Sequence, residues 1–137
     1  MSDDPFGNLQ EWGEALELLD EFSRNGRLAE CQRGLVRILN YRGNWRLREE
    51  VLKRLDQIEA PTDELIGQVL SILADDNTYY EARIMASGAL MHFLKKAESE
   101  LRPELNLKSR KLIEKLCQTP QPPVFEKALQ ECNQALA

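Results

Sequence analysis

The stretch 77–97 reads as one long helix with an unusually broad apolar side. At 100° per residue, its apolar positions fall into two neighbouring stripes rather than one. A helix with an apolar side of this width must pack against neighbours on two sides. We therefore predict a central helix that organises the fold. Its first stripe contains Ala82, Ala86, Ala89, Leu90, Phe93, Leu94 and Ala97, and its second contains Tyr80, Ile84 and Met91.

Six further segments place apolar residues three or four positions apart, the pattern of a helix with one buried side. The chain therefore predicts an all-α fold of seven helices in a single domain, 1–137. Residues on the predicted apolar sides include Trp12, Trp45, Cys117 and Val124. The six additional helices are expected at 8–24, 27–40, 44–58, 62–74, 104–117 and 124–136.

The segment 118–123 is the strongest loop signal in the chain, because three of its six residues are prolines. Proline removes a backbone donor and excludes helical hydrogen bonding. We predict an exposed, protease-sensitive connection here.

Two helix pairs repeat with a spacing of 35 residues, the first at about 28–58 and the second at about 62–97. The segment 104–136 forms a third, diverged pair, as is common at the end of a helical array. The shift places Leu35 on Leu70, Ile38 on Leu73, Asn40 on Asp75, Trp45 on Tyr80, Arg48 on Arg83 and Leu55 on Leu90.

The second helix of each clear pair reads aromatic-x-x-Arg-x-x-Ala/Val-x-x-x-Leu and follows a turn with an acidic or amide residue. This pattern resembles HEAT-like repeats, including the short variety of phycobilisome lyase-type proteins. Asn40 departs from it, because an aspartate is usual there. The resemblance implies an α-α superhelix of about three antiparallel helix pairs after an N-terminal helix. It also implies a concave surface that binds other macromolecules, and no catalytic residue.

Arg48 and Arg83 stand at equivalent positions inside apolar helix sides. A lone buried guanidinium is costly, so we expect each arginine to bond to Asp75, Asp76, Asn40 or loop carbonyls. The alternative is that these arginines bind a ligand.

Asp75 and Asp76 directly precede the central helix. The positive N-terminus of that helix explains adjacent acids better than a metal site or an acid–base pair does. Thr78 and Glu81 then predict a capping box, in which each side chain satisfies a free backbone donor of the other residue.

The net charge is −5, but its distribution along the chain is uneven. Residues 1–23 contain seven acids and no lysine or arginine, whereas residues 24–54 contain nine basic residues and three acids. This basic band predicts either a docking surface or a solvated face. Trp45, Tyr79 and Tyr80 could stack on bases beside it, although the pI of about 5.0 lacks the basic footprint of a nucleic-acid binder.

Residues for catalysis or metal binding are sparse. His92 is the single histidine, and we expect it at the surface. Cys31, Cys117 and Cys132 show no paired spacing, so we expect reduced core cysteines rather than disulfides or a zinc site. The chain has no glycine-rich phosphate loop and no nucleophile motif. We expect no enzyme activity, no cofactor and no metal.

The N-terminus carries acids where a signal peptide carries basic residues, and no apolar run approaches the ~20 residues of a membrane span. We expect a cytoplasmic protein that makes no membrane contact and exists as a monomer or weak homodimer.

The second helices of the two clear pairs should lie side by side on the inner surface, with their polar positions forming parallel ridges. We predict that a protein partner crosses these ridges, while Arg33 and Arg37 on the outer surface stay uninvolved. Alternatives are a nucleic-acid-binding repeat that uses the basic band 24–54, or an accessory subunit of a lyase-type enzyme. The predicted partner site comprises Arg46, Lys53, Met85, Gly88 and His92.

Overall fold

The computed structural model of the protein describes residues 3–97 and 103–136. Within these ranges it contains seven α-helices and no strand, which confirms the predicted fold class. Single turns of 3-10 helix precede α2 at Leu28–Cys31 and follow α3 at Leu55–Gln57. The helices are α1 (Trp12–Arg24), α2 (Gln32–Asn40), α3 (Trp45–Arg54), α4 (Asp63–Ala74), α5 (Tyr80–Ala97), α6 (Pro103–Cys117) and α7 (Pro123–Leu136).

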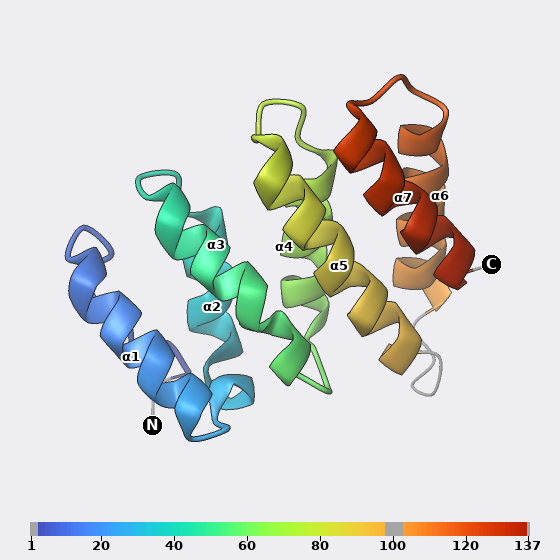
Figure 1. The fold of residues 1–137 in the computed structure, drawn as a ribbon. Helices are drawn as coiled ribbons and strands as arrows, with labels where there is room; N and C mark the ends of the chain where they lie inside the picture. The colour runs from blue at the N-terminus through green and yellow to red at the C-terminus, as the bar shows by residue number, and fades with distance from the viewer. Residues whose placement is uncertain (1–2, 98–102, 137) are drawn as a thin grey trace.

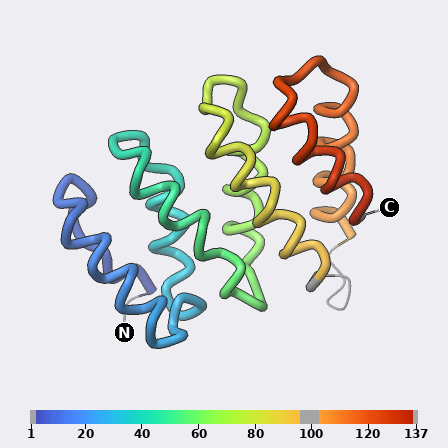
Figure 2. Tube along the Cα trace, viewed as in Figure 1, coloured from blue at the N-terminus to red at the C-terminus, as the bar shows by residue number. Residues whose placement is uncertain are grey.

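The helices form two layers (Figures 1 and 2). Helices α1, α3, α5 and α7 pack side by side in one layer, which we call the front layer, and α2, α4 and α6 form the other. All four front-layer helices start at the same edge, the upper edge in Figure 1. This packing is compatible with a helical superhelix. Within the described residues, no helix combines the length and apolarity that crossing a membrane requires.

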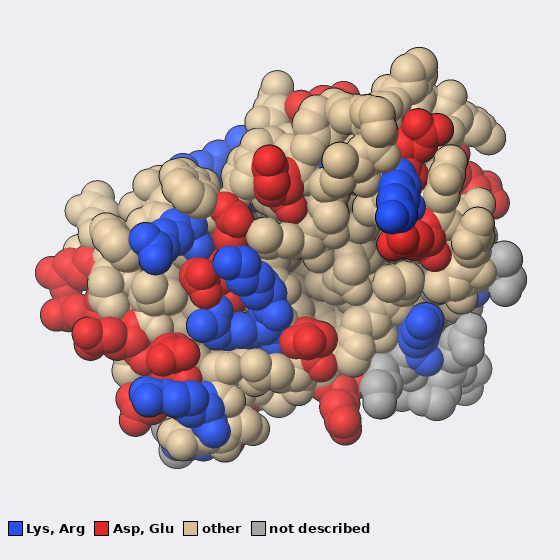
Figure 3. Space-filling view, in the orientation of Figure 1, with Lys and Arg blue, Asp and Glu red and all other residues tan. Residues whose placement is uncertain are grey.

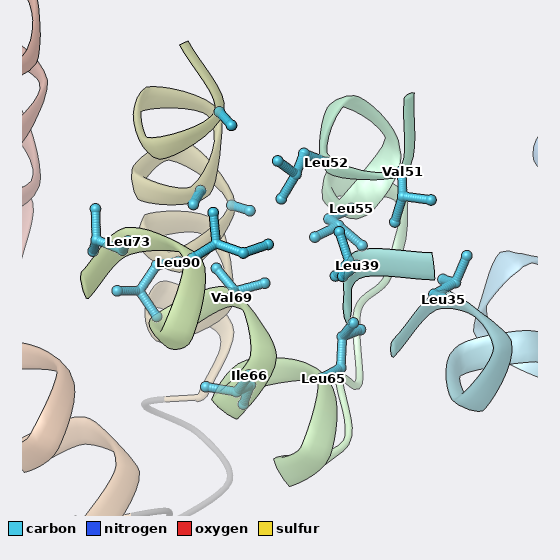
Figure 4. Close-up of a cluster of buried hydrophobic side chains, with 14 of the residues drawn as sticks. Leu35, Leu39, Val51, Leu52, Leu55, Leu65, Ile66, Val69, Leu73 and Leu90 are labelled. Atoms are coloured by element: carbon cyan, nitrogen blue, oxygen red, sulfur yellow. The ribbon is translucent and has the colours of Figure 1, made fainter. Parts of the chain in front are cut away.

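The core is a continuous set of apolar side chains contributed by both layers. Figure 4 shows Leu39, Leu55 and Leu65 among side chains that point into the space between the hairpins α2–α3 and α4–α5. Ala82, Ala86 and Leu90 of the predicted central helix are buried as well. Helix α5 packs against α3, α4 and α7, so its broad apolar side is covered by several neighbours, as predicted.

Side-chain caps fix the starts of two helices. The Asn44 side chain accepts a hydrogen bond from the Leu47 amide at 3.1 Å, and Thr62 accepts one from the Leu65 amide at 3.2 Å. The predicted capping box is wrong, because no hydrogen bond joins Thr78 and Glu81 in the described part of the chain; the Thr78 hydroxyl donates to Asp75 at 2.9 Å. Helix α5 accordingly begins two residues later, at Tyr80.

The N-terminal segment 3–11 is not helical and packs on α2. Phe6 lies over Gly34, where an added Cβ would stand 2.6 Å from the Phe6 ring. Arg37 donates to the Asp4 carboxylate at 2.6 and 2.9 Å and to the Gly7 carbonyl at 2.8 Å. Arg37 therefore holds this segment in place, and its predicted lack of involvement in partner binding stays a prediction.

Five residues expected on buried sides are exposed: Trp12, Trp45, Tyr80, Cys117 and Val124. Each lies within two residues of a helix end, where neighbouring helices no longer cover it. Helical periodicity reports the side of a helix but not how far its neighbours extend along it. The other two cysteines, Cys31 and Cys132, are buried as expected.

Candidate interaction surface

The five predicted partner-site residues lie on two adjacent helices of the front layer. Arg46 and Lys53 on α3 are exposed, as is Gly88 on α5, while Met85 and His92 on α5 are partly buried. Positions 35 residues apart on α3 and α5 have closely similar burial, so both helices turn the same side outward. Figure 3 shows a largely uncharged strip over the middle of α5 on this face.

Gly88 lies in open space. A Cβ at Gly88 would have no atom within 4 Å, so among the described residues no neighbouring helix packs against this glycine. Gly88 instead exposes backbone in the middle of α5.

His92 is less accessible than a plain surface histidine. Its Nε2 is buried and has no hydrogen-bond partner among the described residues, and its ring centroid lies 6.0 Å from that of Phe93. The expectation of a free surface position for His92 is only partly correct.

The basic band 24–54 is largely matched by acids. Six of its nine basic side chains lie within 4 Å of a carboxylate, and several of these acids come from outside the band. In Figure 3, blue groups over α3 alternate with red groups and are flanked by the acids of α1. The band is therefore not a continuous basic stripe. Its six paired members are Arg24, Arg27, Arg37, Arg42, Lys53 and Arg54.

Large exposed apolar side chains gather at one edge of the molecule. Among the described residues there are five such side chains, and four of them occupy the first or second position of a front-layer helix. Trp45 is 62% exposed and Val124 is 69% exposed. Because the four helices start at the same edge, these residues follow that edge across the molecule (Figure 1). We call them the apolar edge: Trp12 of α1, Trp45 of α3, Tyr80 of α5 and Val124 of α7.

An open, almost wholly apolar groove lies at the edge between α3 and α5. Trp45 and Tyr79 form its walls, with ring centroids 6.4 Å apart and planes at 85°. The Tyr79 hydroxyl donates to Glu49 at 2.9 Å, which fixes the tyrosine ring. Burial and this hydrogen bond raise the pKa of Tyr79 well above its usual value, so the phenol remains a donor. Glu49 and Glu81 border the groove.

Arg83 is enclosed between α5 and α7. It is only 2% exposed, and its Nε donates to the Leu73 carbonyl at 3.0 Å. Its guanidinium lies over the rings of Phe125 and Tyr80, at 4.6 and 5.5 Å from their centroids. One Nη stands 3.6 Å from the Asp76 carboxylate. These contacts favour a packing role for Arg83.

Arg48 makes the same backbone contact in the preceding hairpin, where its Nε donates to the Leu39 carbonyl at 3.0 Å. It is only partly buried, however, which is less than we expected. Burial lowers the pKa of Arg48, and the neighbouring Arg42 adds to this effect, while Tyr79 and Asp75 oppose it. The shared contact therefore occurs in two different environments.

The two arginines also reveal the register of the repeat. The second helices of the two hairpins, α3 and α5, correspond at a spacing of 35 residues, since Arg48 corresponds to Arg83. The first helices match at 34, because α2 ends at Asn40 and α4 at Ala74. The predicted uniform shift of 35 is wrong for the first helices, and the turn after α4 is one residue longer than the turn after α2.

No reactive thiol is apparent among the buried cysteines. Burial raises the pKa of Cys31 to about 11 and also raises the pKa of Cys132. Within the described residues, no group of three or more histidine, cysteine or acidic side chains could hold a metal ion.

No family model, no curated protein and no solved structure matches this chain. The resemblance to HEAT-like repeats therefore stays a prediction. The sequence analysis missed the apolar edge, because only the spacing of its aromatic residues, and not their place at the helix starts, can be read from the sequence. Trp12, Trp45 and Tyr80 each begin a helix, at spacings of 33 and 35 residues.

Proposed function

We propose that this protein is a noncatalytic protein-interaction module of the HEAT-like repeat type. The observation that carries the proposal is the apolar edge, where one large apolar residue stands at the start of each front-layer helix: Trp12, Trp45, Tyr80 and Val124. Exposed large apolar residues that gather in one place mark interaction sites, whereas scattered ones need no explanation. Tryptophan and tyrosine are also the residues most enriched at the energetic centres of protein interfaces.

The proposed partner surface extends from the apolar edge onto the outward side of α3 and α5. Trp45 anchors it, and Met85 and Gly88 add accessible uncharged positions farther along α5. Methionine adapts its shape to apolar partners, and a helical glycine lets a partner approach the backbone closely. Arg46 and Lys53 provide charged contacts on the neighbouring α3.

A protein partner fits this surface better than a nucleic acid does. Most basic side chains of the band 24–54 are already paired with carboxylates, which lowers the charge available for phosphates. The protein is also acidic overall. In this proposal the chain is a cytoplasmic monomer or weak homodimer that acts by binding.

Photo-crosslinking from the edge tests the proposal. Trp45 is replaced by p-benzoylphenylalanine in the source cells, and Leu107, an exposed apolar residue on α6 in the other layer, is replaced in the control. We expect Trp45 to yield discrete crosslinked proteins that the Leu107 control lacks. Crosslinks to nucleic acid, or the same protein set from both positions, would contradict the proposal.

A further inference from the structure

A polar pocket of about 220 Å³ lies where the turn after α2 meets α4. Arg48 extends into its lining from α3, and Gln68 and Ser71 contribute from α4. Arg48 uses only its Nε in a hydrogen bond, to the Leu39 carbonyl, and among the described residues the exposed Ser71 and half-buried Gln68 side chains make none. The pocket is therefore lined by donors that are free to bind an acceptor. Its polar lining consists of Asn40, Arg42, Arg48, Gln68, Ser71 and Asp75.

The charges of the pocket do not balance. Arg42 and Arg48 contribute two positive charges, and Asp75 contributes one negative charge. Both carboxylate oxygens of Asp75 are already used within its own turn, by the Asn77 amide and the Thr78 hydroxyl, each at 2.9 Å. Asp75 approaches Arg42 only to 3.6 Å. One positive charge remains without a close carboxylate.

In the hairpin α4–α5, the charge of the equivalent arginine has an acid beside it. Arg83 has Asp76 beside it, seven residues earlier in the chain. Seven residues before Arg48 the chain has Tyr41, and the turn 40–44 contains no acid. Arg83 is covered by the Phe125 ring, whereas Arg48 faces the pocket. The first hairpin thus lacks both the carboxylate and the cover.

We propose that this pocket binds a carboxylate, supplied by an aspartate or glutamate side chain of the partner protein. The proposal rests on the proposed function and names the chemistry of one contact. Arg48 provides charge and Nη donors, and Ser71 and Gln68 provide neutral donors. Trp45 of the groove and Arg48 of the pocket lie one turn apart at the start of α3, so the two sites lie at the same end of this helix. A partner segment can therefore place an apolar side chain at Trp45 and an acidic one at Arg48.

Model compounds test the pocket without the partner. We would titrate ¹⁵N-labelled protein at constant ionic strength with three probes: N-acetylglutamate N-methylamide, N-acetylglutamine N-methylamide and N-acetylglutamine with a free carboxyl terminus. We expect the first to shift the Arg48 Nε–H signal and the Gln68 and Ser71 amides in a saturable way, with the second inactive. Stronger binding of the third would assign the pocket to a chain terminus and overturn the side-chain proposal.

Two charge-matched variants locate the binding. Gln68→Glu adds a negative charge inside the pocket, and Gln130→Glu adds the same charge on the exposed side of α7. We expect Gln68→Glu to weaken glutamate binding by at least about ten-fold, and Gln130→Glu to change it by less than about two-fold. Amide spectra of each variant report its fold.

The proposal would be overturned if wild type and Gln68→Glu bound N-acetylglutamate N-methylamide equally well. It would also be overturned if the signals that shift belonged to residues outside the pocket. If all three probes fail while loss of Trp45 still abolishes partner binding, only the pocket is wrong and the interaction module stands.

Discussion

Arg48 and Arg83 occupy equivalent positions in two hairpins but lie in different environments. Each sits in the second helix of its hairpin and donates Nε to a carbonyl near the end of the first helix at 3.0 Å. Arg83 is then enclosed by α7, whose third residue is Phe125. The third residue of α5 is Ala82, whose methyl group cannot cover Arg48 in the same way. The following helix, rather than the local motif, decides whether the arginine is structural or open to a ligand.

The largest expected difference between Arg83 and Arg48 is in what each contributes to the stability of the fold. We predict that Arg83→Ala lowers the free energy of unfolding by about 3 kcal/mol, because it leaves a cavity under Phe125 and an unpaired Leu73 carbonyl. Arg48→Ala should cost only about 1 kcal/mol, since water can reach the Leu39 carbonyl through the pocket. Urea unfolding of both variants measures these free energies. Equal losses would contradict the claim that the two arginines have different structural roles.

The stability of the hairpin α2–α3 should also depend on the part of α2 against which the N-terminal segment packs. We predict that Gly34→Ala destabilises the fold by about 2 kcal/mol, because the new Cβ would stand 2.6 Å from Phe6 and 2.9 Å from Asp4. Gln68 occupies the matching position on α4 and lines the open pocket instead. Thermal unfolding without a loss for Gly34→Ala would show that the segment does not pack there.

Gly88 should respond in the opposite direction. We predict that Gly88→Ala stabilises the protein by about 1 kcal/mol, because the Cβ meets no atom within 4 Å and alanine favours helix. Denaturant titration beside Gly34→Ala gives a matched pair of identical substitutions. Destabilisation by Gly88→Ala would mean that the space beside α5 is occupied.

The smallest effect should come from the acid beside Arg83. Asp76 is 91% exposed and 3.6 Å from the guanidinium, so we predict that Asp76→Asn changes stability by less than about 0.5 kcal/mol. The carbonyl bond and the aromatic rings then hold Arg83 without it. A loss near that of Arg83→Ala would identify the ion pair as the main support.

Much of the fold follows from the sequence, because apolar spacing locates the helices and prolines mark the loop before α7. Helix starts are less predictable. The prediction began the first helix at residue 8, but the Asn8 side chain accepts a hydrogen bond from the Gln10 amide at 3.0 Å, and Gly7 has φ +65°. These local contacts stabilise a turn, so α1 begins at Trp12.

The candidate site was predictable only in part. The equivalence of Arg48 and Arg83 could be read from the spacing, as could the outward positions on α3 and α5. The exposure of Trp45 could not, because its position at the first turn of α3 matters only relative to the ends of neighbouring helices. The pocket at Arg48 likewise depends on Gln68 and Ser71, which belong to the next hairpin.

The most direct test of the central claim is a binding titration with the protein that crosslinks at the edge. Trp45→Ala and Leu107→Ala each remove one large exposed apolar side chain, from opposite layers of the fold. We predict that Trp45→Ala raises the dissociation constant by about 30-fold or more, as for an interface hot spot, while Leu107→Ala changes it by less than about two-fold. Unchanged affinity for Trp45→Ala, or an equal loss for both variants, would contradict the assignment of the apolar edge as the binding site.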